Sequence, residues 1–371
     1  MLVEERRAAI LRAVERRGAV KVTELAAEMG VSAVTLRQDV RDLAARGLVA
    51  RVHGGAMSLE AADAARSADT EGAAGAVGRA PDSVPGRHRT FGLVVPPGDY
   101  YYPEVIRGVR DASRAHGVRV VLALSGKTLA DNQEQVSRLV EAGVDGLLLM
   151  LRPGLGPAGR TERWLSGLTV PVVLVERRAG PGAGRIEQVV SDHAYGADLA
   201  VRHLAGLGHE RIALVARTES PNTPLISEGY AAAVRSLGLD PGPEHRLRTA
   251  EEPAPAGGRF EEFVRQVEAG AVSAALVHND LDAVALVGLL QARGLRVPEG
   301  LAVVTYDDEV AELSDVPLTA VAPPKRAVGS WAVELLRRRF TAATPPLAEL
   351  LLRPELRVRA SCGADPGETG V

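Results

Sequence analysis

The sequence predicts an α/β protein with a small helical head and a larger body of two lobes, each built around a parallel sheet. From about residue 89 onward, apolar runs of strand length alternate with helical stretches, which is typical of parallel α/β folds. Part of this pattern occurs twice along the body. A segment poor in bulky apolar residues separates the body from the first 57 residues. A chain of 371 residues is long enough for two or three domains.

The composition is that of an ordinary globular protein, with 46% hydrophobic and 25% charged residues. No apolar run reaches the roughly 18 residues that a membrane span needs, and the N-terminus lacks the apolar core of a signal peptide. We therefore expect a cytoplasmic protein without a membrane partner. The single cysteine, Cys362, can form neither an internal disulfide nor a cysteine metal cluster, and we expect no metal site and no cofactor.

Three helices and a hairpin are predicted for the head. Apolar residues recur at helical spacing between Glu4 and Arg17. Thr23 is a suitable N-cap for a second short helix, and Ser32 for a third that Gly47 ends. Residues 49–55 follow as a short hairpin with a Gly-Gly tip. The predicted inward-facing residues are Ile10, Leu11, Val14, Leu25, Ala26, Met29, Leu36, Val40 and Leu43.

Charge differs between the head and the rest of the chain. Residues 1–57 contain ten Lys and Arg against seven Asp and Glu, whereas residues 58–371 contain 34 against 40. This difference favours contact of the head with a polyanion. The face of the third helix opposite its apolar residues carries Arg37, Gln38 and Arg41. In a helix-turn-helix such a face enters the major groove, where Arg can pair with guanine and Gln with adenine.

The candidate DNA contacts also include residues around this face. Side chains at the start of the third helix can reach phosphates, and the hairpin would lie beside the duplex. A small helical bundle with solvated charges is the alternative interpretation of the same pattern. The predicted DNA-contacting residues are Ser32, Thr35, Arg37, Gln38, Arg41, Arg51 and His53.

Two motifs of the head resemble the DeoR-type winged helix-turn-helix. One is Val31-Ser-Ala-Val-Thr-Leu-Arg-Gln-Asp-Val40, and the other is Arg51-Val-His-Gly-Gly-Ala56. The resemblance covers nearly all of residues 1–57 and implies a domain that binds double-stranded operator DNA. The family usually has two adjacent arginines where this chain has Arg37-Gln38. We therefore expect its operator to differ from those of typical relatives.

Residues 58–88 are predicted to form a flexible linker. The segment contains nine Ala, four Gly and two Pro, and only Leu59, Val77 and Val84 are bulky and apolar. Such a segment cannot bury enough surface to offset the entropy of ordering it. We expect the last residues, 363–371, to form a disordered tail. The predicted strands of the body are Phe91–Val95, Val118–Leu124, Gly146–Met150, Val172–Val175, Ile212–Val215, Ala274–Val277 and Leu301–Thr305.

A strand–loop–helix–glycine unit occurs twice in the body, about 121 residues apart. A glycine follows the first strand residue by seventeen positions in both copies, and a second glycine comes nine positions later. Two similar α/β lobes in one chain predict a cleft between them. The paired positions are Phe91 and Ile212, Gly108 and Gly229, and Gly117 and Gly238.

From about Arg89 to Cys362 the body resembles the periplasmic-binding-protein-like effector domain of LacI/GalR regulators. The matching motifs are spread along this region and include Tyr101-Tyr102-Pro, His203-Leu-Ala-Gly-Leu-Gly-His, Asn279-Asp280 and Tyr306-Asp307-Asp308. The resemblance implies one effector domain over 89–362. It assigns lobe 1 to about 89–190 plus a return near 320–338, and lobe 2 to about 191–318 plus the C-terminal segment. It also implies a homodimer and a small sugar effector.

Tyrosines and acids at strand ends are the candidate effector contacts, because open α/β sheets bind ligands there. Tyr100, Tyr101 and Tyr102 follow the first strand, and we expect at most two of them to line the cleft. An aromatic face can stack on a sugar ring. The family pattern favours Tyr101 and Tyr102, and it matches Asp280 to the family's ligand-binding Asp. Arg177, after the fourth strand, is a further candidate. The weaker candidates at other strand ends and crossings are Asp99, Ser125, Arg152, Asp192, Asn222 and Asp307.

One departure from the family pattern concerns the ligand. Family members commonly carry an Arg a few residues before the Gly229-Tyr230 pair, and residues 222–228 of this chain contain none. The leading hypothesis is a repressor of carbohydrate-utilisation genes. An activator would use the same residues, and a nucleoside would also fit an aromatic binding face, so both alternatives stay open. An enzyme is a distant alternative, because HExxH, GxSxG and GxxxxGK[ST] motifs are absent. The predicted DNA-binding head also contradicts a transport protein.

Overall fold

The chain divides into two compact units, Met1–Pro85 and Gly86–Val371, which are described separately below. No helix among the described residues is long and apolar enough to cross a membrane. The computed structural model describes residues 6, 9–10, 13–14, 19–31, 35–36, 39–40, 43, 50–52, 55–57, 89–98, 100–151, 159–180, 186–218, 220–247, 258–341 and 345–364.

In the N-terminal unit a small antiparallel sheet accompanies helical segments. Strands β1 (Ala19–Lys21), β2 (Ala50–Val52) and β3 (Gly55–Met57) form it in the order β1-β3-β2. Helix α2 (Val22–Met29) begins one residue before the predicted cap at Thr23. The hairpin of β2 and β3 confirms a hairpin here but reaches Met57, beyond the predicted residues 49–55, and places Gly55 in a strand; β1 was not expected. The buried cluster consists of Ile10, Ala13, Val14, Val20, Leu25, Ala26, Leu36, Val40 and Leu43.

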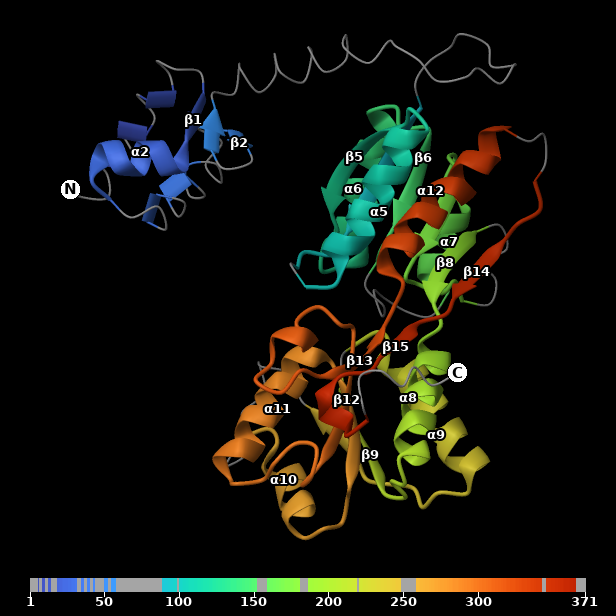
Figure 1. The fold of residues 1–371 in the computed structure, drawn as a ribbon. Helices are drawn as coiled ribbons and strands as arrows, with labels where there is room; N and C mark the ends of the chain where they lie inside the picture. The colour runs from blue at the N-terminus through green and yellow to red at the C-terminus, as the bar shows by residue number, and fades with distance from the viewer. Residues whose placement is uncertain are drawn as a thin grey trace, which may run out of the picture. The chain divides into compact units, whose positions relative to one another are not determined.

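Lobe 1 of the second unit is a six-stranded parallel sheet with helices on both faces (Figure 1). One face packs against α5 and α12 and the other against α6 and α7, so two apolar clusters flank the sheet. In the order of the sheet, the strands are β14 (Glu349–Leu352), β8 (Glu187–Ser191), β7 (Val172–Val175), β6 (Gly146–Leu149), β4 (Thr90–Val95) and β5 (Arg119–Leu124). The helices are α5 (Tyr102–Ala115), α6 (Leu129–Glu141), α7 (Arg160–Ser166) and α12 (Lys325–Thr341).

Lobe 2 has the same architecture with one antiparallel edge strand, β15. Helices α8 and α9 cover one face of its sheet, and α10 and α11 cover the other. Its strands in order are β10 (Glu244–Leu247), β9 (Ile212–Arg217), β11 (Ala274–His278), β12 (Ala302–Tyr306), β13 (Thr319–Ala322) and β15 (Glu355–Arg357). The helices are α8 (His193–Gly206), α9 (Thr223–Leu237), α10 (Glu261–Glu268) and α11 (Asp280–Ala292), with short 3-10 turns at Ala311–Leu313 and Ala360–Cys362.

The duplicated glycines occupy equivalent places in the two lobes. A Cβ at Gly108 would lie 2.0 Å from the carbonyl oxygen of Arg326, where α5 packs on α12. A Cβ at Gly229 would lie 2.0 Å from the carbonyl oxygen of Ala194, where α9 packs on α8. The second glycine of each copy has a left-handed backbone, with φ of +65° at Gly117 and +66° at Gly238. The sequence repeat therefore reflects two copies of one helix–helix contact.

The lobe boundaries differ from the predicted ones at two places. The predicted return to lobe 1 near residue 320 comes later, because Thr319–Ala322 pairs with β12 in the sheet of lobe 2. The chain crosses at Pro323-Pro324, and α12 then packs in lobe 1. Residues 349–352 were predicted in lobe 2, but they pair with β8 in lobe 1. The backbone thus passes between the lobes three times, after β8, β13 and β14.

Candidate functional site

A cavity of about 400 Å³ lies between the carboxyl ends of the two parallel sheets. Side chains from both lobes line it, as the duplicated architecture predicts. Lobe 1 contributes Tyr100, Tyr101, Tyr102 and Arg177. Lobe 2 contributes Arg217, Asn222, Arg259, His278, Asn279 and Asp307.

All three tyrosines line this cavity, which corrects the expectation of at most two. The chain bends at residues 100 and 101, and α5 begins at Tyr102, so the three side chains do not alternate as they would along a strand. The rings of Tyr101 and Tyr102 pack edge to face with centroids 5.7 Å apart. They form a fixed aromatic wall on the lobe 1 side.

A buried carboxylate, Glu176, fixes the position of Tyr101. The Tyr101 hydroxyl donates to Oε1 of Glu176 at 2.7 Å, and Ser191 donates to the same carboxylate through its hydroxyl at 2.7 Å and its backbone N–H at 3.0 Å. Burial opposes ionisation of Glu176, but His193 and these hydrogen bonds lower its pKa to about 2. Sequence reasoning did not find Glu176, since its partners lie 15 to 75 positions away in the chain.

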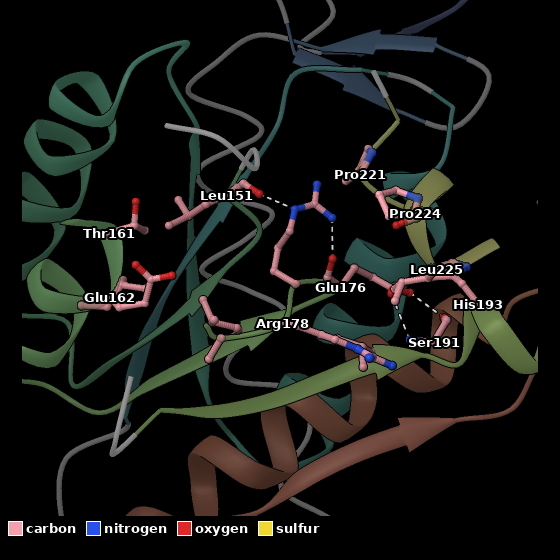
Figure 2. A pocket seen from close by; sticks show the side chains of 16 residues that line it. Leu151, Thr161, Glu162, Glu176, Arg178, Ser191, His193, Pro221, Pro224 and Leu225 are labelled. Atoms are coloured by element: carbon pink, nitrogen blue, oxygen red, sulfur yellow. Dashed lines mark hydrogen bonds and ion pairs between the residues drawn. The ribbon is translucent and has the colours of Figure 1, made fainter. Parts of the chain in front are cut away.

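Arg177 lies where the first cavity meets a second. Its Nη2 donates to the hydroxyl of Tyr102 at 3.1 Å, and its Nε and Nη1 donate to the carbonyl oxygens of Leu151 and Glu176. Arg177 therefore has no carboxylate partner among the described residues. The second cavity, of about 390 Å³, is shown in Figure 2. Pro221 and Asn222 line both cavities, as Arg177 does.

Asp307 is the acid that faces the first cavity from lobe 2. It is 3% exposed, and its Oδ1 has no hydrogen-bond partner in the described part of the chain. Burial raises its pKa to about 7, although Lys325 and His193 act in the opposite direction. His278 lies with Nε2 3.9 Å from Oδ2 of Asp307. Burial, with a smaller effect of nearby cations, lowers the pKa of His278 to about 3, so its ring is neutral at pH 7.

Asp280 was predicted to contact the effector, but the structure places it away from the cavity lining. It is 0% exposed and is the first residue of α11, where Asn279 is the N-cap. Its Oδ2 accepts the backbone N–H groups of Glu309 at 2.6 Å and Val310 at 2.7 Å, and its Oδ1 accepts the hydroxyl of Tyr100. Asp280 is therefore saturated within the protein and does not line the cavity. Its bond to Tyr100 links the two lobes.

The remaining effector candidates are distributed around the site. Asn222 borders both cavities. Ser125 is 6% exposed and lines neither of the two. Asp192 caps α8 by accepting the backbone N–H of Tyr195 at 3.0 Å, so it has a structural partner. Asp99 and Arg152 lie outside the described residues.

Two arginines and one acid that belong to none of the sequence motifs form a cluster on the lobe 2 side. Arg217 at the end of β9 and Arg259 before α10 both pair with Asp282 of α11. Asp282 is 0% exposed, whereas the side chains of Arg217 and Arg259 are 42% and 41% exposed. The sequence did not predict this cluster, because residues 217, 259 and 282 lie far apart along the chain.

In the head, the structure describes few of the candidate DNA contacts. Thr35 is helical and exposed, and the backbone of Arg51 lies in β2. Ser32, Arg37, Gln38, Arg41 and His53 lie outside the described residues.

The two-lobed fold with a cavity between its sheets, joined to a helix-turn-helix head, defines the class of ligand-binding transcription regulators. Two family models match the chain. A DeoR-like helix-turn-helix domain matches residues 6–62, and a periplasmic binding protein-like domain matches residues 201–362. The DeoR-type head and the LacI-type body that the sequence resembles are both confirmed.

Known repressors are similar along most of the chain. The ribose operon repressor of Escherichia coli K12 is 30% identical over 268 residues, covering 70% of this chain and 78% of that protein. The arabinose metabolism transcriptional repressor of Geobacillus stearothermophilus is 25% identical over 350 residues, covering 91% and 89%. The solved structure of a CelR–cellobiose complex is 26% identical with a TM-score of 0.62 and covers 92% of this chain and 99% of that one. The chain belongs to the LacI family of transcriptional regulators, and it is a regulator rather than an enzyme.

Proposed function

We propose that this chain represses carbohydrate-utilisation genes by binding operator DNA, and that a sugar bound in the cavity between the lobes controls this binding. The observation that carries the proposal is a cavity lined by aromatic and polar side chains of both lobes, in a chain with a DNA-binding head. Two of the repressors to which it is similar are named for ribose and arabinose, and a similar solved structure holds cellobiose.

The chemistry of the cavity supports a sugar. Tyrosine faces pack on the C–H face of a pyranose or furanose ring. Asp307 lines the cavity and its carboxyl group can hydrogen-bond to ring hydroxyls, and Asn222 can both donate and accept. The aromatic wall belongs to lobe 1 and the acid to lobe 2, so a sugar that contacts both favours one arrangement of the lobes. We propose Tyr101, Tyr102, Arg177, Asn222 and Asp307 as effector contacts.

The head supplies the DNA contacts in this proposal. Residues 1–57 would bind double-stranded DNA, the linker 58–88 would connect them to the effector domain 89–362, and a homodimer would place two heads on a pseudo-palindromic operator. The proposed contacts are Ser32, Thr35, Arg37, Gln38, Arg41, Arg51 and His53. Sugar and operator binding would be coupled reciprocally, typically by about 1–3 kcal/mol.

Binding of the full chain to genomic DNA fragments tests the proposal. Enriched fragments are sequenced, and the recovered site is used in gel shifts against a panel of pentoses, hexoses, disaccharides and nucleosides. We expect a specific site upstream of sugar-utilisation genes and release of the protein by one sugar. Specific DNA binding that no sugar changes, with release by a nucleoside, would refute the sugar effector. Absence of any specific site would refute the regulator itself. Sedimentation of the protein–operator complex measures the number of chains bound.

A further inference from the structure

We propose that the effector is an anionic sugar derivative, carrying a carboxylate or a phosphate, and that Arg217 and Arg259 bind its charged group. This inference rests on the proposed function, because it names the class of sugar that enters the same cavity. It depends on a group of side chains outside the motifs that identify the family.

The first observation is a pair of arginines held by one buried acid. Arg217 donates to both oxygens of Asp282, with Nη2 3.0 Å from Oδ1, and Nη2 of Arg259 lies 2.8 Å from the same Oδ1. Both guanidinium groups border the cavity, while Asp282 behind them has no exposed surface. The acid therefore fixes the two cations on the cavity wall without offering an oxygen to a ligand. Such pre-positioned guanidinium groups favour carboxylates and phosphates, which can accept two parallel N–H bonds.

The second observation is the charge balance of the cavity. The described lining residues include three arginines, Arg177, Arg217 and Arg259, and one acid, Asp307. Among the side chains that line the cavity, the arginines therefore outnumber the acids by two. His278 adds no charge at pH 7, since its pKa is lowered to about 3, and the raised pKa of Asp307 leaves part of that acid protonated. An anionic ligand would pair directly with the arginine side chains that line the cavity, whereas a neutral sugar would offer them no counter-charge.

The third observation is the donor capacity left on these side chains. Arg217 uses Nε and Nη2 on Asp282, and its Nη1 has no partner among the described residues. Arg259 uses Nη2 on Asp282, and its guanidinium carbon lies 4.9 Å from the centroid of Phe260, which orients the plane. The remaining N–H groups can reach a carboxylate or phosphate in the cavity.

Thermal unfolding of the full chain with matched neutral and anionic probes tests the proposal. The neutral probes are D-glucose, D-galactose, D-ribose and D-sorbitol. Their anionic counterparts are D-glucuronate, D-galacturonate, D-gluconate, glucose 6-phosphate, galactose 6-phosphate and ribose 5-phosphate, with inorganic phosphate added alone. All solutions are adjusted to one ionic strength. A ligand at about ten times its Kd raises the melting temperature of a domain of this size by roughly 3 °C.

The same titrations on three variants assign the effect to the arginine pair. Arg217→Gln and Arg259→Gln each leave Asp282 one cationic partner, and each shift is measured against the melting temperature of its own variant. Arg265→Gln is the matched control, because Arg265 lies on α10 of the same lobe, is 62% exposed and pairs with Glu262 away from the cavity. A tenfold loss of affinity in the first two variants would reduce a 3 °C shift to roughly 1 °C at the same concentration.

We expect at least one anionic probe to stabilise the protein more than its neutral parent, and we expect the first two variants to lose this difference while Arg265→Gln keeps it. A response to sugar acids alone identifies a carboxylate, and a response to sugar phosphates or inorganic phosphate identifies a phosphate. Equal shifts for every anionic and neutral pair, or an anion preference that survives both substitutions, would overturn this inference. A neutral sugar that releases the operator would then leave the proposed function intact, whereas failure of every sugar in the gel shift would remove both.

Discussion

Replacing Asp307 by Asn should stabilise the unliganded protein at neutral and alkaline pH. The carboxyl group is 3% exposed, one oxygen has no partner among the described residues, and its pKa is raised to about 7 from 3.8. Between about pH 4 and 7, the carboxyl group of Asp307 therefore binds a proton more tightly in the native state than in the unfolded state. Native stability from this group consequently falls as the pH rises through that window. Asn cannot ionise, so the free energy of unfolding of the variant does not fall in this way as the pH rises.

The size of the effect follows from the pKa difference. A rise of about 3 units at about 1.36 kcal/mol per unit gives on the order of 4 kcal/mol once the pH exceeds 7. Residual hydration of the cavity reduces this figure, and we expect a gain of about 2–4 kcal/mol at pH 8 and close to none at pH 4. The backbone of Asp307 has φ of 86°, a left-handed conformation that Asn adopts readily, so the substitution adds little strain.

Urea unfolding at a series of pH values between about 4 and 8 measures this difference. The control is Asp240→Asn, which removes an exposed carboxyl after α9. We expect the free energies of unfolding of Asp307→Asn and the wild type to diverge as the pH rises, and those of the control and the wild type to stay parallel. If the free energies of unfolding of Asp307→Asn and the wild type differed by the same amount at every pH, the desolvation of Asp307 would not be the cause.

Three further predictions concern the packing of α9 on α8 at Gly229, the hydrogen bond between Asp280 and Tyr100, and the DNA-contacting face of the third helix of the head. Gly229→Ala should cost about 1–3 kcal/mol or more, because its Cβ would overlap a backbone oxygen of α8, whereas Gly288→Ala, with open space in α11, should gain about 0.5–1 kcal/mol in the same urea titration. Asp280→Ala should weaken effector binding at least roughly tenfold in calorimetry by releasing Tyr100, with operator binding kept; undiminished affinity would separate this lobe link from effector binding. Arg37→Ala should cost about 1–3 kcal/mol of operator affinity in gel shifts and relax preference at one base pair; unchanged affinity and preference would remove Arg37 from the reading face.

The fold could be predicted from the sequence where the signal is local. All seven predicted strands exist with ends shifted by at most two residues, because buried parallel strands are continuous apolar runs. The repeat of Gly108 and Gly229 is visible because both helices need a residue without Cβ at the same contact. The strands β8, β10, β13, β14 and β15 were not predicted, since none of them contains more than three consecutive apolar residues.

The candidate site could be predicted only in part, because burial decides which polar groups remain free. Asp280 and Asp307 both follow strands of lobe 2, and the sequence ranked Asp280 higher. The turn after β12 points two backbone N–H groups at Asp280 and saturates it, whereas Asp307 keeps one oxygen without a partner among the described residues. Glu176 and Asp282 belong to no motif and bind partners from distant segments. Such pairings follow from the packing of the elements and not from spacing along the chain.

The three crossings between the lobes have a consequence for how such a gene can change by recombination. Each lobe is assembled from separate stretches of the chain, since β13 and β15 of lobe 2 flank α12 and β14 of lobe 1 along the sequence. One breakpoint cannot exchange either lobe intact, and an exchange at any of the crossings would combine parts of two sheets. The helix-turn-helix region is instead one uninterrupted stretch, matched over residues 6–62. A single join after it can transfer the whole DNA-binding specificity to another effector domain, which is how a DeoR-like head and a LacI-type body can occur in one reading frame.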